Sequence, residues 1–195
     1  MKEWKIVIGV PGKIIAGDIK VESSMVDART HSLLNRKISS RSSGSELNLT
    51  GFMKLTNVTL SEHNNREYQE VRKYKELLIR KSDIFFVYDE NQPKNIALEE
   101  IPEPVPQSGD LIQKKTHHLE LVTRTVGNSY YQINGKFTGF LKHFEDNDFI
   151  QMMNVTIVEF LKREDGFLKL KYDKKSFISV NTRIIEHVAE AEIHG

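Results

Sequence analysis

Two similar segments, about 100 residues apart, constrain the fold of this chain more than any other feature of its sequence. Residues 51–60 align with residues 148–157 at an offset of 97, with four identical positions and three exchanges between apolar side chains. Further along, residues 77–84 align with residues 177–184 at an offset of 100. Two blocks in the same order at nearly the same separation indicate a tandem duplication, in which one folding unit occurs twice.

The matched segments have the composition of β-strands. They are short, rich in Val, Ile, Phe and Thr, and bounded by polar clusters. In each copy of the first block the apolar residues alternate, and the alternation resumes after an odd step of three residues. Since strand side chains switch faces at every residue, an odd step requires one residue to bulge out. We therefore predict a bulge or sharp bend at Asn57 and Asn154, which turns a long strand around the corner of a small barrel. The alternative is a strand buried on both faces, without a bulge.

Two further segments bear on the local structure. Residues 164–166, Glu-Asp-Gly, predict a hairpin turn before the alternating residues 168–172. Residues 66–74, at the equivalent place in the first half, suit a short helix or an extended hairpin equally well.

A proline-rich acidic stretch separates the halves. Four of the five prolines lie between residues 93 and 106, and residues 89–110 contain six Asp and Glu but one Lys. Because proline fixes φ and lacks an N–H group, we predict a linker at 89–112 between domains at 1–88 and 113–195. An ordered loop lying across one domain is the alternative. Residues 36–46 are rich in serine and poor in apolar side chains, so we expect a mobile loop insertion in the first domain.

The composition excludes several classes of protein. The chain has no cysteine, so it has no disulfide framework, thiolate zinc site or cysteine nucleophile. No apolar run approaches the roughly 20 residues of a membrane span. The start of the chain does not resemble a secretory signal, so a cytoplasmic location is expected. The net charge is only +1, although residues 1–88 contain 15 Lys and Arg against 10 Asp and Glu. The whole chain therefore lacks the strongly basic balance of a non-specific nucleic-acid binder.

No motif of catalysis or metal binding stands out. Residues 9–13, Gly-Val-Pro-Gly-Lys, resemble a phosphate-binding loop only superficially, because the glycines are too close and no Ser or Thr follows the lysine. A turn between strands is the better interpretation. The seven histidines include no pair with the spacing of metal ligands. We expect a non-enzymatic protein without a cofactor or a bound metal.

Two motifs are similar to those of the Sm-like family of small barrels. Residues 135–144 contain a glycine, an apolar residue, then glycine-apolar-leucine and a phenylalanine before an acidic loop, which resembles the first family motif. Residues 77–87, with an apolar triplet before Arg80, resemble the second. The resemblance covers about 70 to 85 residues of each half. The chain departs from the family in lacking a glycine after Arg80, and Val180 stands where the second half would have arginine.

The resemblance implies an all-β fold of two tandem barrels of the SH3 type, each with five strongly bent antiparallel strands. It implies that edge strands pair between neighbours, and that RNA binds in the loops after the second and fourth strands of each barrel. The implied RNA-binding positions are Arg80, Lys81, Asn147, Asp148, Asn181 and Thr182. Independently of the family, the basic residues Arg36, Lys37 and Arg41 are candidates for phosphate contact, with a solvated charged loop as the alternative.

Two functions follow as hypotheses. The first is an RNA-binding or RNA-associated module, whose partner is single-stranded RNA. The second is a protein-assembly module whose edge strands pair between copies of the chain, without nucleic acid. The resemblance favours the first, and the near-neutral charge favours the second. Neither involves a membrane.

Overall fold

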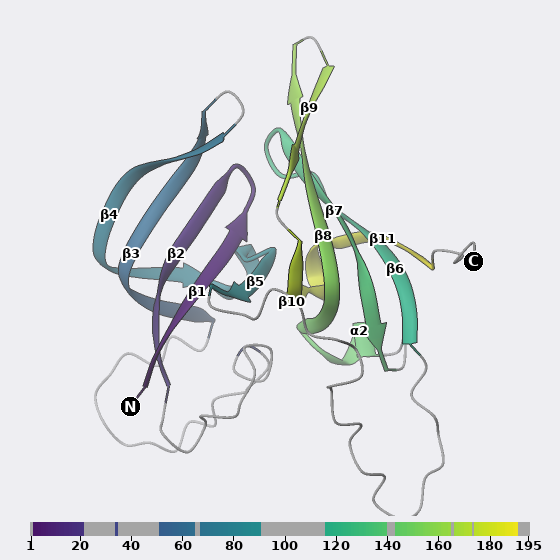
Figure 1. Cartoon of the computed structure of the whole chain (residues 1–195), viewed down its shortest axis with the longest axis horizontal. Coiled ribbons are helices and arrows are strands. Elements are labelled where there is room, and N and C mark those ends of the chain that lie inside the picture. The colour runs from purple at the N-terminus through teal and green to yellow at the C-terminus, as the bar shows by residue number, and fades with distance from the viewer. Residues whose placement is uncertain are drawn as a thin grey trace, which may run out of the picture.

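A computed structural model describes residues 2–21, 34, 51–64, 67–90, 116–139, 143–164, 166–172 and 174–190 (Figure 1). Arg36, Lys37 and Arg41 in the serine-rich segment, and the proline-rich stretch from residue 91 onward, lie outside the described residues. In the part of the chain that is described, no helix has the length and apolar character needed to cross a membrane.

The described residues are almost entirely β-structure, which confirms the prediction of an all-β fold. The strands are β1 (Lys2–Val10), β2 (Lys13–Val21), β3 (Phe52–Asn64), β4 (Glu67–Arg80), β5 (Phe86–Asp89), β6 (Thr116–Thr123), β7 (Ser129–Thr138), β8 (Phe149–Arg163), β9 (Gly166–Lys171), β10 (Lys175–Asn181) and β11 (Ile185–Glu190). The remaining elements are short, namely helix α2 (His143–Asp146) and the 3-10 turns η2 (Lys81–Asp83) and η4 (Thr182–Ile184). The predicted turns at 9–13 and 164–166 are confirmed, and the ambiguous segment 66–74 belongs to β4.

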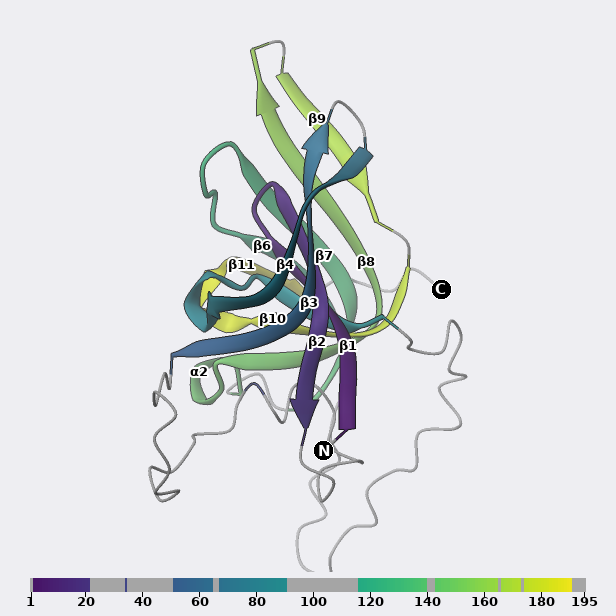
Figure 2. The ribbon, with the colours of Figure 1, turned by 90° about the vertical axis from the view of Figure 1, so that its left-hand side faces the viewer.

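All eleven strands belong to one antiparallel sheet, in the order β11-β6-β7-β8-β10-β5-β1-β2-β3-β4, with β9 paired to β8 beside this path. The pairing therefore differs from the two separate closed barrels that we expected. It is an open path that passes from one half to the other through β10 and β5. Figure 1 shows the two halves as curved lobes that meet at these strands, and Figure 2 views the same ribbon from the side of the first half. A buried strand edge must pair its N–H and C=O groups, and each half satisfies the edge of the other.

The same strand order occurs in both halves. The first half has the order β5-β1-β2-β3-β4, and the second has β11-β6-β7-β8 followed by β10. Strand β8 pairs with β10 along its first part and with β9 along its second part, so β9 and β10 together occupy the place of β4.

The second pair of aligned blocks is shifted by one residue in the structure. The amide of Lys81 donates to the carbonyl of Gly51 at 2.8 Å, and the amide of Thr182 donates to the carbonyl of Asp148 at 2.9 Å. These bonds, and the turns η2 and η4, lie 101 residues apart rather than the predicted 100. The sequence alignment matched Ile84 with Ile184. The hydrogen-bonded turns instead make Ile84 equivalent to Ile185, the residue that follows η4 as Ile84 follows η2.

The predicted bulges are confirmed at both positions. Asn57 has a φ of 50° and Asn154 a φ of 51°, and the β2–β3 and β7–β8 ladders both shift register there. Asparagine tolerates this left-handed conformation better than most residues. Glycine stands opposite each bulge: a Cβ atom on Gly135 would lie 2.9 Å from the Val155 side chain. The bulged strand thus bends closely over the neighbouring backbone.

The two hydrophobic cores share residues across the halves. Phe85 and Phe86 of the first half are buried in the core of the second half, beside Tyr131 and Val180. In return, Phe149 of the second half is buried in the core of the first. The residue after β5, Glu90, is also held in the first half. Its amide donates to the backbone carbonyl of Lys5 at 3.1 Å, and its carboxylate pairs with the Lys5 ammonium at 2.7 Å.

The bulge gives a prediction about stability. The free energy of unfolding of Asn154→Gly should lie within about 0.5 kcal/mol of that of the unchanged chain, because glycine adopts a positive φ freely. Asn154→Ala should lose about 1 kcal/mol, since its Cβ is strained in that region. Urea unfolding followed by circular dichroism measures both. Equal stability of the two variants would contradict the positive φ at this residue.

Candidate functional site

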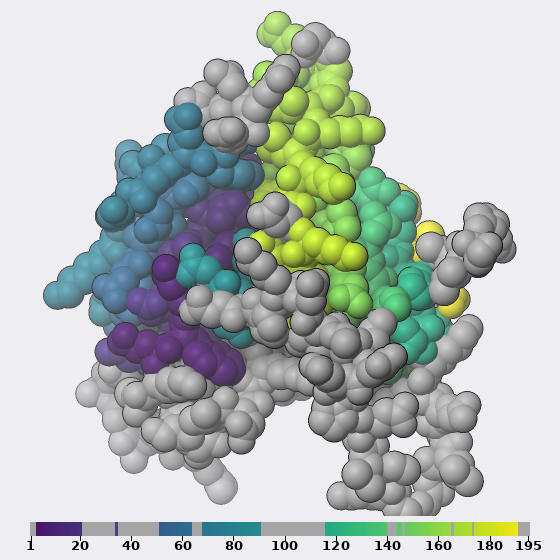
Figure 3. All heavy atoms as spheres, in the orientation of Figure 1, coloured from purple at the N-terminus to yellow at the C-terminus, as the bar shows by residue number. Residues whose placement is uncertain are grey.

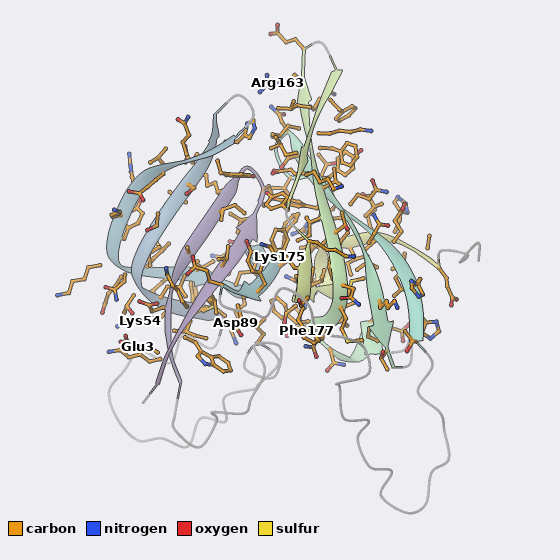
Figure 4. The ribbon with its side chains drawn as sticks, viewed as in Figure 1. Glu3, Lys54, Asp89, Arg163, Lys175 and Phe177 are labelled. Carbon is orange, nitrogen blue, oxygen red and sulfur yellow. The ribbon has the colours of Figure 1, made fainter. Side chains whose placement is uncertain are left out.

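The junction between the halves is the most distinctive site of the described chain. Strand β10 pairs with β5 through Ser179 opposite Val87 and Val180 opposite Phe86. The ladder continues in Asn181, whose amide donates to the carbonyl of Phe85 at 3.0 Å. Figure 4 labels Lys175 and Phe177 on β10 and Asp89 on β5, on the two sides of this junction. All four paired residues are buried, so the pairing excludes water.

Aromatic packing fills the space behind the junction. The Phe86 ring packs edge-on against Tyr131 at 5.2 Å and Tyr172 at 6.0 Å. Gly9 allows this, because a Cβ atom at residue 9 would lie 2.1 Å from the Phe86 ring. At the rim, the ammonium of Lys175 lies 4.6 Å from the centre of the Tyr88 ring. Offset and edge-to-face contacts of this kind stabilise an interface beyond the area that they bury.

A buried carboxylate ties the halves together above the aromatic rings. Glu159 on β8 is 0% exposed. One of its oxygens accepts from the amide of Gly12 at 3.0 Å, and the other accepts from the hydroxyls of Tyr68 and of Tyr172, the latter at 2.9 Å. Nearby, the Tyr131 hydroxyl donates to the carbonyl of Val10 at 2.9 Å. Gly12, Tyr68 and Val10 belong to the first half, so these bonds cross the junction.

The protonation of the tyrosine hydroxyls gives this cluster a structural role. Burial raises the pKa of Tyr68, Tyr131 and Tyr172, and the negative charge of Glu159 adds to the shift. The hydroxyls therefore stay protonated and act as hydrogen-bond donors over the physiological range. A buried charge is tolerated only where such donors surround it. The cluster therefore fixes how the halves face each other.

The structure brings several of the predicted RNA-binding residues together at the base of the junction. Thr182 Oγ1 donates to the carbonyl of Asn147 at 2.6 Å. Asn181 Nδ2 donates to the carbonyl of Ile84 at 2.8 Å and lies 3.4 Å from that of Lys81. The first half thus contributes Lys81 and the second half contributes Asn147, Asn181 and Thr182. Arg80, by contrast, lies exposed at the end of β4, with its guanidinium 5.7 Å from the centre of the Phe52 ring.

The polar groups at this base are engaged within the protein. Asp148 accepts from Arg183 at 2.8 and 2.7 Å, so neither charge is unpaired. The amide of Arg183 donates to the Asn181 side chain at 3.0 Å, which places Asn181 as the N-cap of η4. Burial lowers the pKa of Lys81, and the charge of Asp148 opposes this shift. The printed contacts of Asn181, Thr182 and Asp148 therefore hold the loops in place, and their predicted role in RNA binding stays a prediction.

Sequence reasoning missed the residues of the junction itself, namely Phe86, Glu159, Tyr68 and Tyr172. One signal was available for Glu159, because it is the one charged residue in the apolar run 157–161. A carboxylate inside such a strand is either exposed on one face or buried with donors. Its donors come from residues 12 and 68, and no local pattern connects these positions.

The two ends of the sheet are the second notable feature. Strand β4 ends the path in the first half and β11 ends it in the second, so within the described residues each has one unpaired edge. The exposed large hydrophobic side chains of these strands are Val71, Leu78 and Val188. Exposed edges with apolar side chains are favourable surfaces for pairing with another strand.

Comparison with known proteins identifies no relative. No protein-family model matches the chain, and no curated protein or solved structure matches it.

The Glu159 cluster predicts a large effect of one substitution. Glu159→Ala removes the acceptor of the Gly12 amide and of the Tyr68 hydroxyl in a buried place, while the Tyr172 hydroxyl keeps that of Tyr68 at 3.0 Å, so the free energy of unfolding should fall by about 2–4 kcal/mol. Urea unfolding measures this loss. The control is Glu3→Ala, which removes an exposed glutamate of β1 and should change stability by less than about 0.5 kcal/mol. Equal effects of the two substitutions would contradict the role of the cluster.

His63 predicts a dependence of stability on pH. Its Nε2 atom is buried without a hydrogen-bond partner among the described residues, and its ring lies edge-on to Tyr68 at 5.8 Å. Burial lowers the pKa of His63, Glu159 opposes the shift and Arg163 adds to it. Since the folded state then binds a proton less readily than the unfolded state, stability should fall as the pH drops below about 6.5.

The measurement compares urea unfolding at about pH 7.5 and pH 5.5, on either side of the ordinary histidine pKa. His63→Gln should lose less stability over this interval than the unchanged chain, because other titrating groups are common to both. An identical loss would show that His63 titrates normally.

Proposed function

We propose that this chain is a self-assembly module, in which chains associate head to tail by antiparallel pairing of β4 with β11 of the next chain. In this proposal each half is one copy of a strongly bent, five-stranded unit of the Sm-like type. The observation that supports it is the junction of β10 with β5. That junction joins the fourth-strand position of one half to the fifth-strand position of the other, and β4 and β11 hold the same two positions at the free ends.

The junction also supplies a register for the free edges. Positions equivalent to Ser179 and Val87 lie 101 residues away, at Leu78 and Val188. Transferring the pairing of Ser179 with Val87 therefore places Leu78 opposite Val188. Both side chains are 48% exposed in the single chain. Two exposed apolar residues that fall directly opposite each other form a favourable cross-strand pair.

Charges around this register are compatible with pairing. Arg80 falls opposite Glu186, which gives an attractive pair across the edges. Glu76 falls opposite Glu190, and these two carboxylates are already paired within the chain, to Lys54 at 3.2 Å and to His117 at 3.0 Å.

A second carboxylate repeats the position of Glu159. Glu62 lies opposite Lys13 in the β2–β3 ladder, as Glu159 lies opposite Tyr131 in the β7–β8 ladder. In the assembly Glu62 would face the connection between β6 and β7 of the next chain, where Arg124 is exposed. The intermolecular junction would then be more polar than the internal one.

A head-to-tail interface of this kind uses different surfaces on its two sides. Repeated, it closes into a ring or continues as an open filament, according to the rotation between chains. RNA binding at the loops stays a prediction of the family resemblance. The geometry favours RNA binding at these loops less than self-assembly, because Asp148, Asn181 and Thr182 use polar side-chain atoms in hydrogen bonds within the protein.

The register makes the assembly testable. Leu78→Lys and Val188→Lys should each shift the chain toward the monomer by about tenfold or more in the concentration for half-association, because a charge replaces the apolar pair. Combining Leu78→Lys with Val188→Glu should restore association through an opposite-charge pair. Light scattering after size-exclusion chromatography, over a range of concentrations, measures the mass.

Val71→Lys is the matched control. Val71 lies on the same strand with the same 48% exposure, but the transferred register places it beyond the end of β11. It should leave the assembly unchanged. A monomer at every concentration, or equal effects of Val71→Lys and Leu78→Lys, would contradict the proposal.

A further inference from the structure

A second exposed surface lies on the hairpin of β8 and β9, which projects beyond the rest of the described chain (Figure 1). Cross-strand partners share a face of a sheet, and here Tyr130 is opposite Phe160, Phe160 opposite Lys169, and Lys162 opposite Phe167. Lys171, two residues after Lys169, is on the same face. The hairpin face therefore comprises Tyr130, Phe160, Lys162, Phe167, Lys169 and Lys171. The hairpin is also prominent at the top of the space-filling view in Figure 3.

The aromatic side chains of the hairpin face form one cluster. The Tyr130 and Phe160 rings are parallel, with centres 4.8 Å apart and planes at 3°. Phe167 lies edge-on to Tyr130 at 6.0 Å. It is 57% exposed, more than any other large hydrophobic residue of the described chain. The Phe167 ring, supported by Tyr130 and open to solvent, is a platform on which a further ring can stack.

Three cations surround this platform, and one carboxylate, that of Glu164, follows Lys162 by two residues in the turn at its tip. Lys162, Lys169 and Lys171 are exposed, and the ammonium of Lys169 lies 5.3 Å from the centre of the Phe160 ring. Glu159, the neighbour of Phe160, points to the opposite face and is buried. Glu164 in the turn limits the basic area at the tip. The face thus alternates rings with positive charges.

We propose that the hairpin face binds single-stranded nucleic acid, with a base stacked on Phe167 and backbone phosphates held by the three lysines. Surfaces that bind single strands combine a positive charge along the backbone with aromatic rings for the bases. Protein–protein interfaces are instead depleted in lysine, and three lysines stand on this face. This site is separate from the loop positions considered above, and it does not depend on the assembly of chains.

The test measures binding of fluorescently labelled oligonucleotides of about 12 residues, a length within the usual site size of a single-strand binder. Oligouridine, oligoadenine and oligothymidine distinguish RNA from DNA and one base from another. Anisotropy is recorded on the full chain at about 50 mM salt, where the electrostatic contribution to binding is large. Phe167→Ala should weaken binding by about tenfold or more through the loss of stacking. Phe167→Trp should retain it.

The charges are tested by a triple variant, Lys162→Gln with Lys169→Gln and Lys171→Gln. It should weaken binding and reduce the slope of log K against log salt by about 2, since three phosphate contacts are lost. The matched control has the same change of charge at exposed cations of β4, Arg72→Gln with Lys73→Gln and Lys75→Gln, and should bind as the unchanged chain does. No binding to any oligonucleotide, or binding that only the control variant weakens, would overturn the proposal.

Discussion

The structure depends on the pairing of β5 with β10. This short ladder joins two halves whose strand order is the same, and it lets Phe85 and Phe86 of one half complete the core of the other. If the halves separated, these two rings and the edges of both strands would lose their partners. Burial of a phenylalanine side chain alone contributes about 2–3 kcal/mol. The halves therefore share core residues and one sheet at the junction, although the sequence suggests two domains.

Hydrogen bonds to Glu159 add directional contacts to the packing between the halves. An isolated buried carboxylate would be costly, and apolar packing alone would allow the halves to slide on each other. The carboxylate restricts this freedom, because two of its donors come from the other half, Gly12 from the β1–β2 turn and Tyr68 from β4. A rigid angle within the chain is what a repeated contact between chains requires, since a variable angle would prevent regular assembly.

The sequence predicted the local structure better than the arrangement of the halves. The phase break at Asn57 and Asn154 is a local pattern, and both bulges are present because an extra residue brings the second apolar run back to the buried face. The continuous sheet was not predicted, since the pairing of Val87 with Ser179 spans 92 residues and leaves no periodic trace. The family resemblance gave Asn181, Thr182 and Asn147 as RNA-binding positions, and it did not predict that Thr182 donates a hydrogen bond to the Asn147 carbonyl. Composition shows which residues are polar; only packing shows which of their atoms are already bonded.

The internal junction and the proposed junction between chains differ in strength for a physical reason. Within one chain the two strands are covalently connected, so pairing costs no translational freedom. Between chains the overlap is limited to the six residues of β11, and the side chains that would meet are half-exposed rather than buried. One such contact is weak on its own. A closed ring gains one more contact than an open chain of the same number of copies without losing further translational freedom, so closure converts weak contacts into a stable assembly. Association should therefore depend on whether the angle between the halves permits closure, more than on the strength of any single edge pair.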